Sequence, residues 1–330
     1  MKKIINAPEN YTDDMLRGLY GAHGDKVHFV NDDLRCYCIR EKVPGKVAIV
    51  TGGGTGHLPL FLGYVGKNLL DGCAVGSVFQ SPSAEQIFEI SKAVDNGAGV
   101  LYLYGNYTGD IMNFDMAAEL CGMEDIPTRS IVGADDVNSN ADEAARRGVA
   151  GIFFLYKCAG AAAARMDDLD HVLAAAQKAK DNTRTVGFAL TPCVIPEIGH
   201  ANFSLGENEM AMGMGIHGEP GIWNGPVKTA DELAAESLET LLRDMPVAAG
   251  EEVALLINGL GATSVEELYI LCGSVSRILQ EKGIGIYRSF VGEFATSMEM
   301  AGASISLMKL DAETKEMLDL PVSTPFYCQG

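Results

Sequence analysis

The sequence predicts an α/β protein made of two α/β units, with the active site in the cleft and loops between them. Apolar runs typical of buried strands alternate with helix-forming segments through the first half of the chain. This order is typical of a mostly parallel sheet flanked by helices. A stretch rich in proline and glycine follows at 191–228, and a second, smaller set of helices and strands comes after it. We place the boundary near residue 187, which gives an N-terminal unit over 1–186 and a second unit over 187–330.

Strands and helices of the first unit follow from apolar runs and from helical periodicity. Three apolar runs predict buried strands: 46–50, 99–104 and 151–156. Three segments have the periodicity or composition of helices: 83–95, 114–121 and 159–180. Pro82 precedes the first of these helices, and Ser81 is its expected cap. The last helix is expected because alanine has the highest helix propensity. When each strand of a parallel sheet is followed by a helix, the loops that connect them lie together at the carboxyl edge of the sheet.

The second unit has the same two kinds of signal. Its expected strands are 252–258, 285–290 and 304–310. Its expected helices are 230–243 and 265–281. The tail at 321–330 reads as extended chain, and we expect it to pack back on the first unit.

Composition and charge exclude several classes of function. The chain has 330 residues, 47% of them hydrophobic and 21% charged, which is ordinary for a globular protein. No apolar run approaches the length needed to cross a bilayer, and the opening apolar run is too short for a signal sequence. We therefore expect a cytoplasmic protein with no membrane contact. The net charge of −19 argues against direct nucleic-acid binding, because phosphates would be repelled.

Eight cysteines are scattered along the chain, and only Cys36 and Cys38 lie close together. This spacing lacks the pattern of a metal site, so reduced and mostly buried thiols are expected.

One histidine, His217, lies within the glycine-rich segment 213–221. Glycines there permit unusual backbone dihedrals and leave open space beside the ring. An imidazole next to open space serves as a ligand, a base or a nucleophile. A glycine-rich surface turn that happens to contain a histidine explains the segment equally well.

A second glycine loop, 52–57, follows the strand at 46–50 and ends in His57. Its backbone N–H groups suit an anion or a polar ligand. A phosphate-binding P-loop would end in Lys followed by Ser or Thr, and a dinucleotide-binding loop would have glycine in place of His57. The sequence therefore argues against both nucleotide-binding interpretations.

Asp110 follows the strand at 99–104, where an acidic residue often points into the crevice of a parallel sheet. His57 and Asp110 together would make an acid–base pair for a hydroxyl group. The spacing alone slightly favours the alternative, in which Asp110 caps the next helix and His57 fills a turn. Asp135 and Asp136 suggest Mg²⁺, but an acidic pair after a strand more often serves turns and helix caps, so no metal site is expected.

Taken together, the loop motifs resemble the K subunit, the substrate-binding half, of dihydroxyacetone kinase. The resemblance runs essentially end to end, and its motifs occur in the family's order. They are 52–57, 63–66, 78–83, 106–110, 135–137, 146–150, 160–163, 215–221, 260–263 and 267–269. So many loop motifs in one order are specific for the family and less specific for the substrate.

This resemblance implies roles for particular residues. The histidine matching His217 attacks the ketone carbon of dihydroxyacetone and holds it as a covalent hemiaminal. The residues matching His57 and Asp110 act on the substrate hydroxyl as hydrogen-bond partner and base. The predicted substrate-binding set is Gly54, Thr55, Gly56, His57, Ser81, Gly105, Asp110 and His217. A carbonyl adds an imidazole nitrogen, whereas glycerol has no carbonyl, so the covalent bond rejects polyols.

The resemblance also implies partners. No cofactor is expected on this chain, because the Mg²⁺ nucleotide (ADP or ATP) belongs to a separate L subunit. In one branch of the family a phosphotransferase-system protein, the M component, recharges that nucleotide, and in another branch ATP is the donor. A homodimer is expected on the same ground.

Three positions near the predicted site depart from the family pattern. The family usually has Glu where this chain has Leu58, often has His or a similar residue near Phe61, and usually has Lys where this chain has Gly105. Loss of the ammonium at 105 removes a charge-assisted hydrogen bond of about 1.5–3 kcal/mol and leaves room for a larger substrate. One hypothesis is a kinase subunit for dihydroxyacetone or a larger ketose such as erythrulose. The other is a non-catalytic ketone sensor that acts on a transcriptional regulator, and a third is a binding protein for another carbonyl compound. Retention of His57, Asp110 and His217 favours the kinase.

Overall fold

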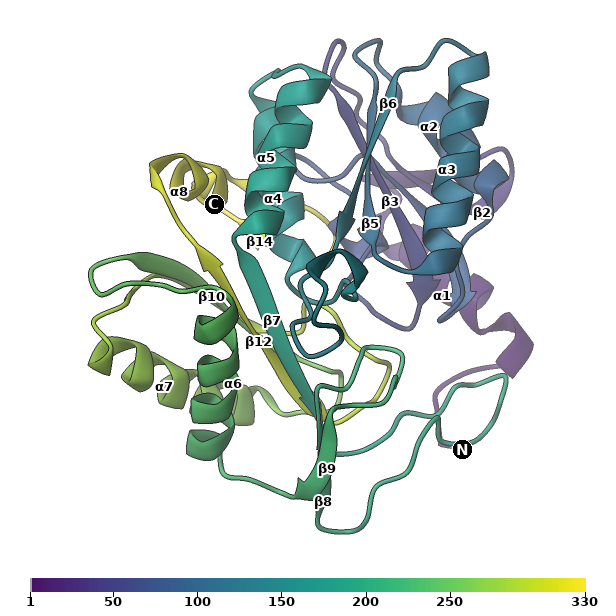
Figure 1. Ribbon diagram of the computed structural model, residues 1–330. Coiled ribbons are helices and arrows are strands. Elements are labelled where there is room, and N and C mark those ends of the chain that lie inside the picture. Colours follow the sequence, from purple (N-terminus) through teal and green to yellow (C-terminus); the bar gives the residue numbers. More distant parts are fainter. Residues whose placement is uncertain (1) are drawn as a thin grey trace.

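Two six-stranded sheets organise the computed structural model, which describes residues 2–330 (Figure 1). The first sheet has the strand order β1-β2-β4-β3-β5-β6. Its strands are β1 (Val27–Val30), β2 (Asp33–Ile39), β3 (Ala48–Thr55), β4 (Gly72–Val78), β5 (Val100–Gly105) and β6 (Thr128–Gly133). Strands β4, β3, β5 and β6 pair in parallel, whereas β1 and β2 are antiparallel additions at one edge. From β3 the chain goes to β4 on one side and later to β5 on the other, so its winding reverses between β3 and β5.

Helices cover both faces of this sheet. They are α1 (Tyr11–His23), α2 (Ala84–Val94), α3 (Thr108–Met123), α4 (Ile152–Ala164) and α5 (Leu169–Asp181). Side chains of β3 and β5 alternate between two hydrophobic clusters, one shared with α2 and α3 and the other with α4 and α5. This alternation is the period of two that a strand buried on both faces imposes. Short 3-10 turns complete the unit: η1 (Pro8–Asn10), η2 (Leu62–Tyr64) and η3 (Glu143–Ala145).

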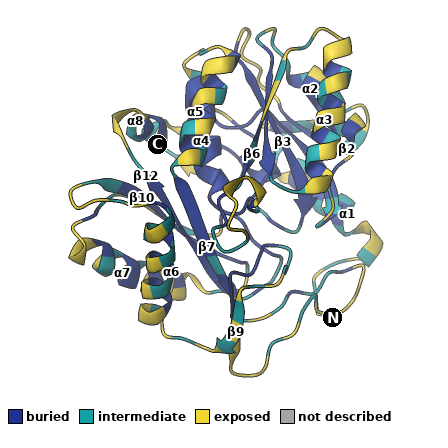
Figure 2. Ribbon diagram, viewed as in Figure 1, coloured by how far each residue is buried: buried dark blue, intermediate teal, exposed yellow. Residues whose placement is uncertain are grey.

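The second sheet has the order β11-β10-β12-β7-β8-β9. Its strands are β7 (Thr183–Ala189), β8 (Glu209–Met212), β9 (Trp223–Pro226), β10 (Glu252–Gly259), β11 (Gly285–Gly292) and β12 (Gly302–Lys309). Helices α6 (Ala230–Asp244) and α7 (Val265–Glu281) share a hydrophobic cluster with one face. Residues of the other face, including Ala211, Leu256 and Phe290, belong to a cluster that also contains α4 and α5. One continuous core therefore joins the two units, and the helices expose only their outer faces (Figure 2).

The predicted α/β class with two units is confirmed, but several local expectations are wrong. The segment 151–156 was expected to be a strand and is instead the first turns of α4, whose residues 152–163 are all buried. A short apolar run does not distinguish a buried strand from a buried helix. The helix expected over 159–180 is two helices, because the chain turns between α4 and α5. Ser83, and not Ser81, caps α2, through a capping box with Gln86.

The structure also shows where the chain crosses from the first unit to the second and where the C-terminal tail packs. The boundary expected at 187 falls inside β7, so the chain enters the second sheet at Thr183. Helix α8 (Ala312–Asp319) packs against α4, and the tail forms β13 (Val322–Ser323) and β14 (Cys328–Gln329). The hydroxyl of Thr324 donates to the Gly63 carbonyl at 2.8 Å, which attaches the tail to the first unit.

The eight cysteines are all free, and six of them are buried. Across the described part of the chain, no helix combines the length and the apolar character needed to span a membrane.

Candidate active site

Loops at the carboxyl ends of three parallel strands carry predicted site residues. His57 follows β3, Ser81 follows β4, and Asp110 lies in the first turn of α3 after β5. The winding reverses between β3 and β5, and the loops at such a reversal are the usual ligand-binding position of a parallel sheet. The position of Asp110 therefore follows from the topology as well as from its place at the start of a helix.

His217 reaches the same place from the second sheet. It lies in the connection between β8 and β9, where Gly213 and Gly218 have φ of +79° and +81°. Its ring centroid is 4.7 Å from that of His57 and 4.7 Å from that of Tyr107. The His217 side chain is 23% exposed. The glycine-rich His217 loop therefore packs against the loops of the first sheet and is not an isolated surface turn.

Glu219 sets the tautomer of His217. Its carboxylate lies 2.9 Å from His217 Nδ1 and accepts a second hydrogen bond from the His217 backbone N–H at 2.9 Å. Burial raises the pKa of Glu219, but the hydrogen bond and charge of His217 and the charge of Arg147 outweigh it and lower this pKa to about 2. An ionised carboxylate only accepts hydrogen bonds, so in the neutral form of the ring Nδ1 carries the proton and Nε2 keeps its lone pair. This lone pair makes Nε2 the nucleophilic atom.

His57 is fully buried and is held as a neutral acceptor. Its Nδ1 lies 2.8 Å from the Thr296 carbonyl, which only accepts, so His57 Nε2 also keeps its lone pair. Burial, followed by the nearby His217, lowers the pKa of His57 to about 3. The His57 ring stacks on Phe79 at 4.8 Å. At neutral pH His57 therefore accepts a hydrogen bond from a ligand but does not act as an acid.

Asp110 is 5% exposed, and burial raises its pKa to about 6 against the hydrogen bond of Ser81 and the charge of His217. Within residues 2–330, neither Asp110 Oδ1 nor His57 Nε2 has a hydrogen-bond partner, although both atoms are buried. Buried polar atoms without partners are rare in proteins and call for an explanation. Both atoms are acceptors, so a ligand that donates O–H groups would satisfy them.

The glycine loop is shaped by close packing. A Cβ at Gly54 would lie 2.7 Å from Phe79 Cα, and one at Gly56, where φ is +98°, would lie 2.7 Å from the Phe79 ring. Gly54 lies in β3 and Gly56 just after it, so the end of β3 can pack directly against Phe79 after β4. The glycine loop expected over 52–57 is therefore strand as far as Thr55. Thr55 does not join the other predicted residues, because its hydroxyl pairs with that of Thr12 on α1 at 3.1 Å.

Gly105 does not leave the room that the sequence led us to expect. The Tyr107 ring lies 3.0–3.1 Å from the position of a Cβ at Gly105, and the Tyr107 hydroxyl donates to the Gly148 carbonyl at 3.1 Å. The space beside Gly105 is therefore filled by an aromatic ring that also contacts His217.

Asp135 and Asp136 have structural partners. Asp135 accepts from the backbone N–H groups of Val149 and Gly151 at 2.9 and 2.8 Å, at the start of α4, and Asp136 pairs with Arg147 at 2.7 Å. This matches the turn and cap interpretation. In the part of the chain that the structure describes, no group of three or more His, Cys, Asp or Glu side chains is placed to hold a metal ion.

Sequence reasoning missed four residues around His217: Phe79, Tyr107, Arg147 and Glu219. Glu219 had a signal, because it follows His217 by two residues in the same motif. Thr296 had none, since it lies 239 residues from the His57 ring that it orients.

Comparisons with known proteins agree on one family. A model of the Dak1 domain matches residues 17–326. A "PTS-dependent dihydroxyacetone kinase 2, dihydroxyacetone-binding subunit DhaK" of Listeria innocua is 44% identical over 99% of each chain. A "D-erythrulose kinase" of Mycolicibacterium smegmatis is 42% identical over all of this chain, which spans 57% of that relative.

Solved structures give the same picture. The structure titled "Dihydroxyacetone kinase operon co-activator Dha-DhaQ" has a TM-score of 0.90 at 29% identity and covers 96% of this chain and 98% of its own. The dihydroxyacetone kinase of C. freundii has a TM-score of 0.91 at 28% identity, over 99% of this chain and 60% of its own. The likeness therefore extends to enzymes and to a co-activator.

Proposed function

Because the chain belongs to the Dak1 family, as a protein of the DhaK type, we propose that it is the ketose-binding subunit of a dihydroxyacetone-type kinase. In this proposal His217 binds dihydroxyacetone, or a related short ketose, as a covalent hemiaminal. A partner subunit then phosphorylates a hydroxyl of the bound sugar. The activity is that of a phosphotransferase with an alcohol group as acceptor.

The covalent step uses the lone pair of His217 Nε2. This nitrogen attacks the ketone carbon, a C–N bond forms, and the π bond of the carbonyl breaks as its oxygen becomes an alkoxide. The alkoxide takes up a proton from water and becomes the hemiaminal hydroxyl, while the ring keeps the proton on Nδ1, which donates to the Glu219 carboxylate. Glu219 lies 2.9 Å from Nδ1 and stabilises the positive charge that the ring carries during addition. Glycerol lacks a carbonyl and forms no such bond.

Asp110 and His57 act on the sugar hydroxyl. With a pKa of about 6, Asp110 is mostly ionised at neutral pH and accepts the hydroxyl proton as the alcohol attacks the phosphorus. His57 is neutral and offers Nε2 as an acceptor, which orients the same sugar. Asp110 is thus the base and His57 the positioning partner.

One observation carries the proposal. The His217 ring, from the second unit, lies 4.7 Å from the His57 ring, in a part of the molecule where two buried acceptors of the first unit lack partners. A ketone with O–H groups on either side of its carbonyl meets both requirements at once.

The phosphoryl group is expected to come from a nucleotide-binding L subunit that holds Mg²⁺ with ADP or ATP. Relatives 44% and 42% identical carry "PTS-dependent" in their names, which supports a phosphotransferase-system protein as the source of phosphate. A homodimer and a cytoplasmic location complete the proposal. Sedimentation of the purified chain tests the dimer, and a monomer at micromolar concentration would remove that part.

Turnover tests the proposal. The purified chain is mixed with an L subunit, a Mg²⁺ nucleotide system and short ketoses, and sugar phosphate is measured. We expect product with dihydroxyacetone or erythrulose and none with glycerol. Asp110→Asn should lose turnover but keep the covalent ketose, whereas His217→Ala should lose the covalent ketose. Retention of the adduct in His217→Ala would show that the nucleophile is misassigned.

A ketone-sensing co-activator is the second candidate, supported by the TM-score of 0.90 to a structure titled as a dihydroxyacetone kinase operon co-activator. The same assay separates the two functions. A chain that binds ketose covalently but yields no sugar phosphate with any L subunit, and that binds a transcriptional regulator instead, would establish the sensor.

A further inference from the structure

Arg147, in the first unit, contacts the His217 loop on both sides of His217. Its Nη2 donates to the Gly213 carbonyl at 2.8 Å, and its Nη1 lies 3.9 Å from Glu219 Oε2. Gly213 precedes His217 by four residues, and Glu219 follows it by two. A single side chain from the first unit therefore links the two arms of a loop that belongs to the second unit.

The guanidinium of Arg147 is itself held firmly. Its Nε and Nη2 contact Asp136 Oδ2 at 3.0 and 2.7 Å, and its backbone N–H donates to the Ser139 hydroxyl at 3.0 Å. The side chains of Arg147 and Asp136 are 14% and 3% exposed. A buried guanidinium whose donors are fixed in a planar fork has little freedom to reorient.

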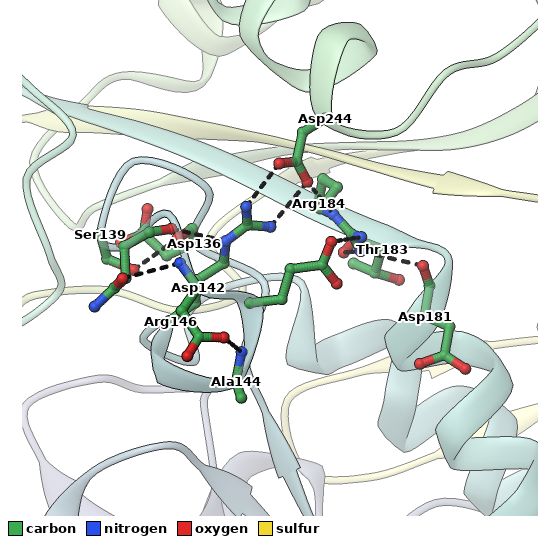
Figure 3. Close-up of polar contacts among 11 residues, drawn as sticks. Asp136, Ser139, Asp142, Ala144, Arg146, Asp181, Thr183, Arg184 and Asp244 are labelled. Carbon is green, nitrogen blue, oxygen red and sulfur yellow. Dashed lines mark hydrogen bonds and ion pairs between the residues drawn. The ribbon is translucent and has the colours of Figure 1, made fainter.

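The neighbouring Arg146 anchors the same segment to the second unit. Its two terminal nitrogens bind Asp244, the last residue of α6, at 2.8 and 2.6 Å. Arg184 binds the same carboxylate, and Figure 3 shows both arginines directed at Asp244. Arg146 also hydrogen-bonds the Asn140 carbonyl at 3.0 Å. Consecutive arginines thus fasten this segment to α6 and to the His217 loop.

Gly215 shows how closely Arg147 and Glu219 approach the loop backbone. A Cβ at Gly215 would lie 2.1 Å from Glu219 Oε2 and 2.6 Å from Arg147 Nη1. No side chain at position 215 fits while both groups keep their places. Gly215 is therefore part of the same arrangement.

We propose that Arg147 is the positioning residue of His217: it holds Glu219 and the loop in the orientation that fixes the proton on Nδ1 and the lone pair on Nε2. The inference rests on the proposed function, since it concerns the same covalent step. Without the guanidinium, Glu219 loses a neighbouring positive charge and the loop loses the bond at Gly213. The proton of His217 is then free to move between the two ring nitrogens, and in one of the two tautomers the ring cannot attack through Nε2.

Arg147→Gln in the full-length chain tests the inference, with Arg129→Gln as the matched control. Arg129 lies on β6 and is 48% exposed, in a surface pair with Asp170. Nitrogen NMR of labelled histidine reports the His217 tautomer, and carbon NMR with dihydroxyacetone labelled at its ketone carbon reports the adduct. We expect Arg147→Gln to lose the pure Nδ1–H tautomer and to weaken the adduct roughly ten- to a hundredfold. Arg147→Lys should be intermediate, and the control should match the wild type.

A second variant covers the case in which Arg147→Gln does not fold. Gly215→Ala displaces Glu219 and Arg147 without removing a charge, and it should weaken the adduct in the same way. If the folded variants keep both the tautomer and the adduct of the wild type, the inference is wrong. If the wild type itself forms no adduct with any short ketose, the proposed function fails instead.

Discussion

Removal of the Ser81 hydroxyl should move the acid limb of the activity profile to higher pH. Burial raises the pKa of Asp110 to about 6, and the nearby Ser81 hydroxyl, which favours the charged carboxylate, acts in the opposite direction. Asp110 acts in its deprotonated form, so activity is present above this pKa and is lost as pH falls through it. In the wild type about nine tenths of Asp110 is ionised at pH 7 and about one tenth at pH 5.

The size of the shift follows from the hydrogen bond. A hydrogen bond to a charged group contributes about 1.5–3 kcal/mol, and one pKa unit corresponds to about 1.4 kcal/mol. Ser81→Ala should therefore raise the pKa of Asp110 by about one unit, because a water molecule that replaces the hydroxyl recovers part of the loss. Near pH 6 the variant should then have about a fifth of the wild-type kcat/KM, and at high pH the two should converge.

The assay is kcat/KM for the ketose, measured from pH 5 to 9 with a saturating L subunit; these limits lie about one unit below and three units above the expected pKa. Ser204→Ala, a change at an exposed serine in the loop before β8, is the matched control. A Ser81→Ala profile that superimposes on that of the wild type would refute the assignment of Asp110 as the base. A uniform loss of activity at every pH would point instead to a role of Ser81 in binding.

Three further changes test other parts of the account. Gly56→Ala should lower the free energy of unfolding by about 1–3 kcal/mol, because φ is +98° and the new Cβ would collide with the Phe79 ring. Gly97→Ala, where φ is +88° and the space is open, is the control for backbone strain alone. Equal losses of stability in the two variants would refute a packing role of Gly56. Gly105→Lys requires a shift of the Tyr107 ring, because a Cβ there would lie 3.0 Å from it. The new ammonium should then increase the preference for dihydroxyacetone over erythrulose in kcat/KM, and an unchanged preference would show that residue 105 does not set it. The pKa of His57 is lowered to about 3, so its contribution to the free energy of unfolding should be complete above about pH 6.5 and decrease toward pH 3 by up to about 1.4 kcal/mol per pH unit. Urea unfolding of His57→Gln at several pH values should lack this decrease. If the free energies of wild type and variant change with pH in the same way, His57 is not held neutral.

The elements that the sequence predicts well have a local cause. Helix α7 begins and ends where its periodicity does, because Ser264 and Glu267 form a capping box at its start and an amphipathic stripe runs through it. The strands β3 and β5 lie where apolar runs end in glycine. The neighbourhood of His57 and Asp110 follows from topology, since the loops after these two strands meet where the winding reverses.

The elements that the sequence misses depend on tertiary contacts. Helix α4 is buried on every side, Lys157 included, so it has no amphipathic stripe to distinguish it from a strand. Strands β8 and β9 are four residues each and are defined by their pairing. The filling of the space at Gly105 by Tyr107, two residues along the chain, could not be read from composition.

Site chemistry divides in the same way. Glu219 was within reach of sequence reasoning, because it shares a motif with His217. Thr296 and Arg147 were not, since each acts on a histidine from a distant part of the chain. Sequence order therefore identifies the reactive side chains, and the fold identifies the groups that set their protonation.

The central claim is a bond between His217 Nε2 and the ketone carbon of the sugar. Nitrogen-labelled protein saturated with dihydroxyacetone carrying ¹³C at that carbon tests it directly, through the one-bond coupling between the two nuclei. We predict a tetrahedral carbon coupled to His217 Nε2, which is absent in His217→Ala. A saturated complex in which the carbon stays a free carbonyl, or couples to another nitrogen, would contradict the account.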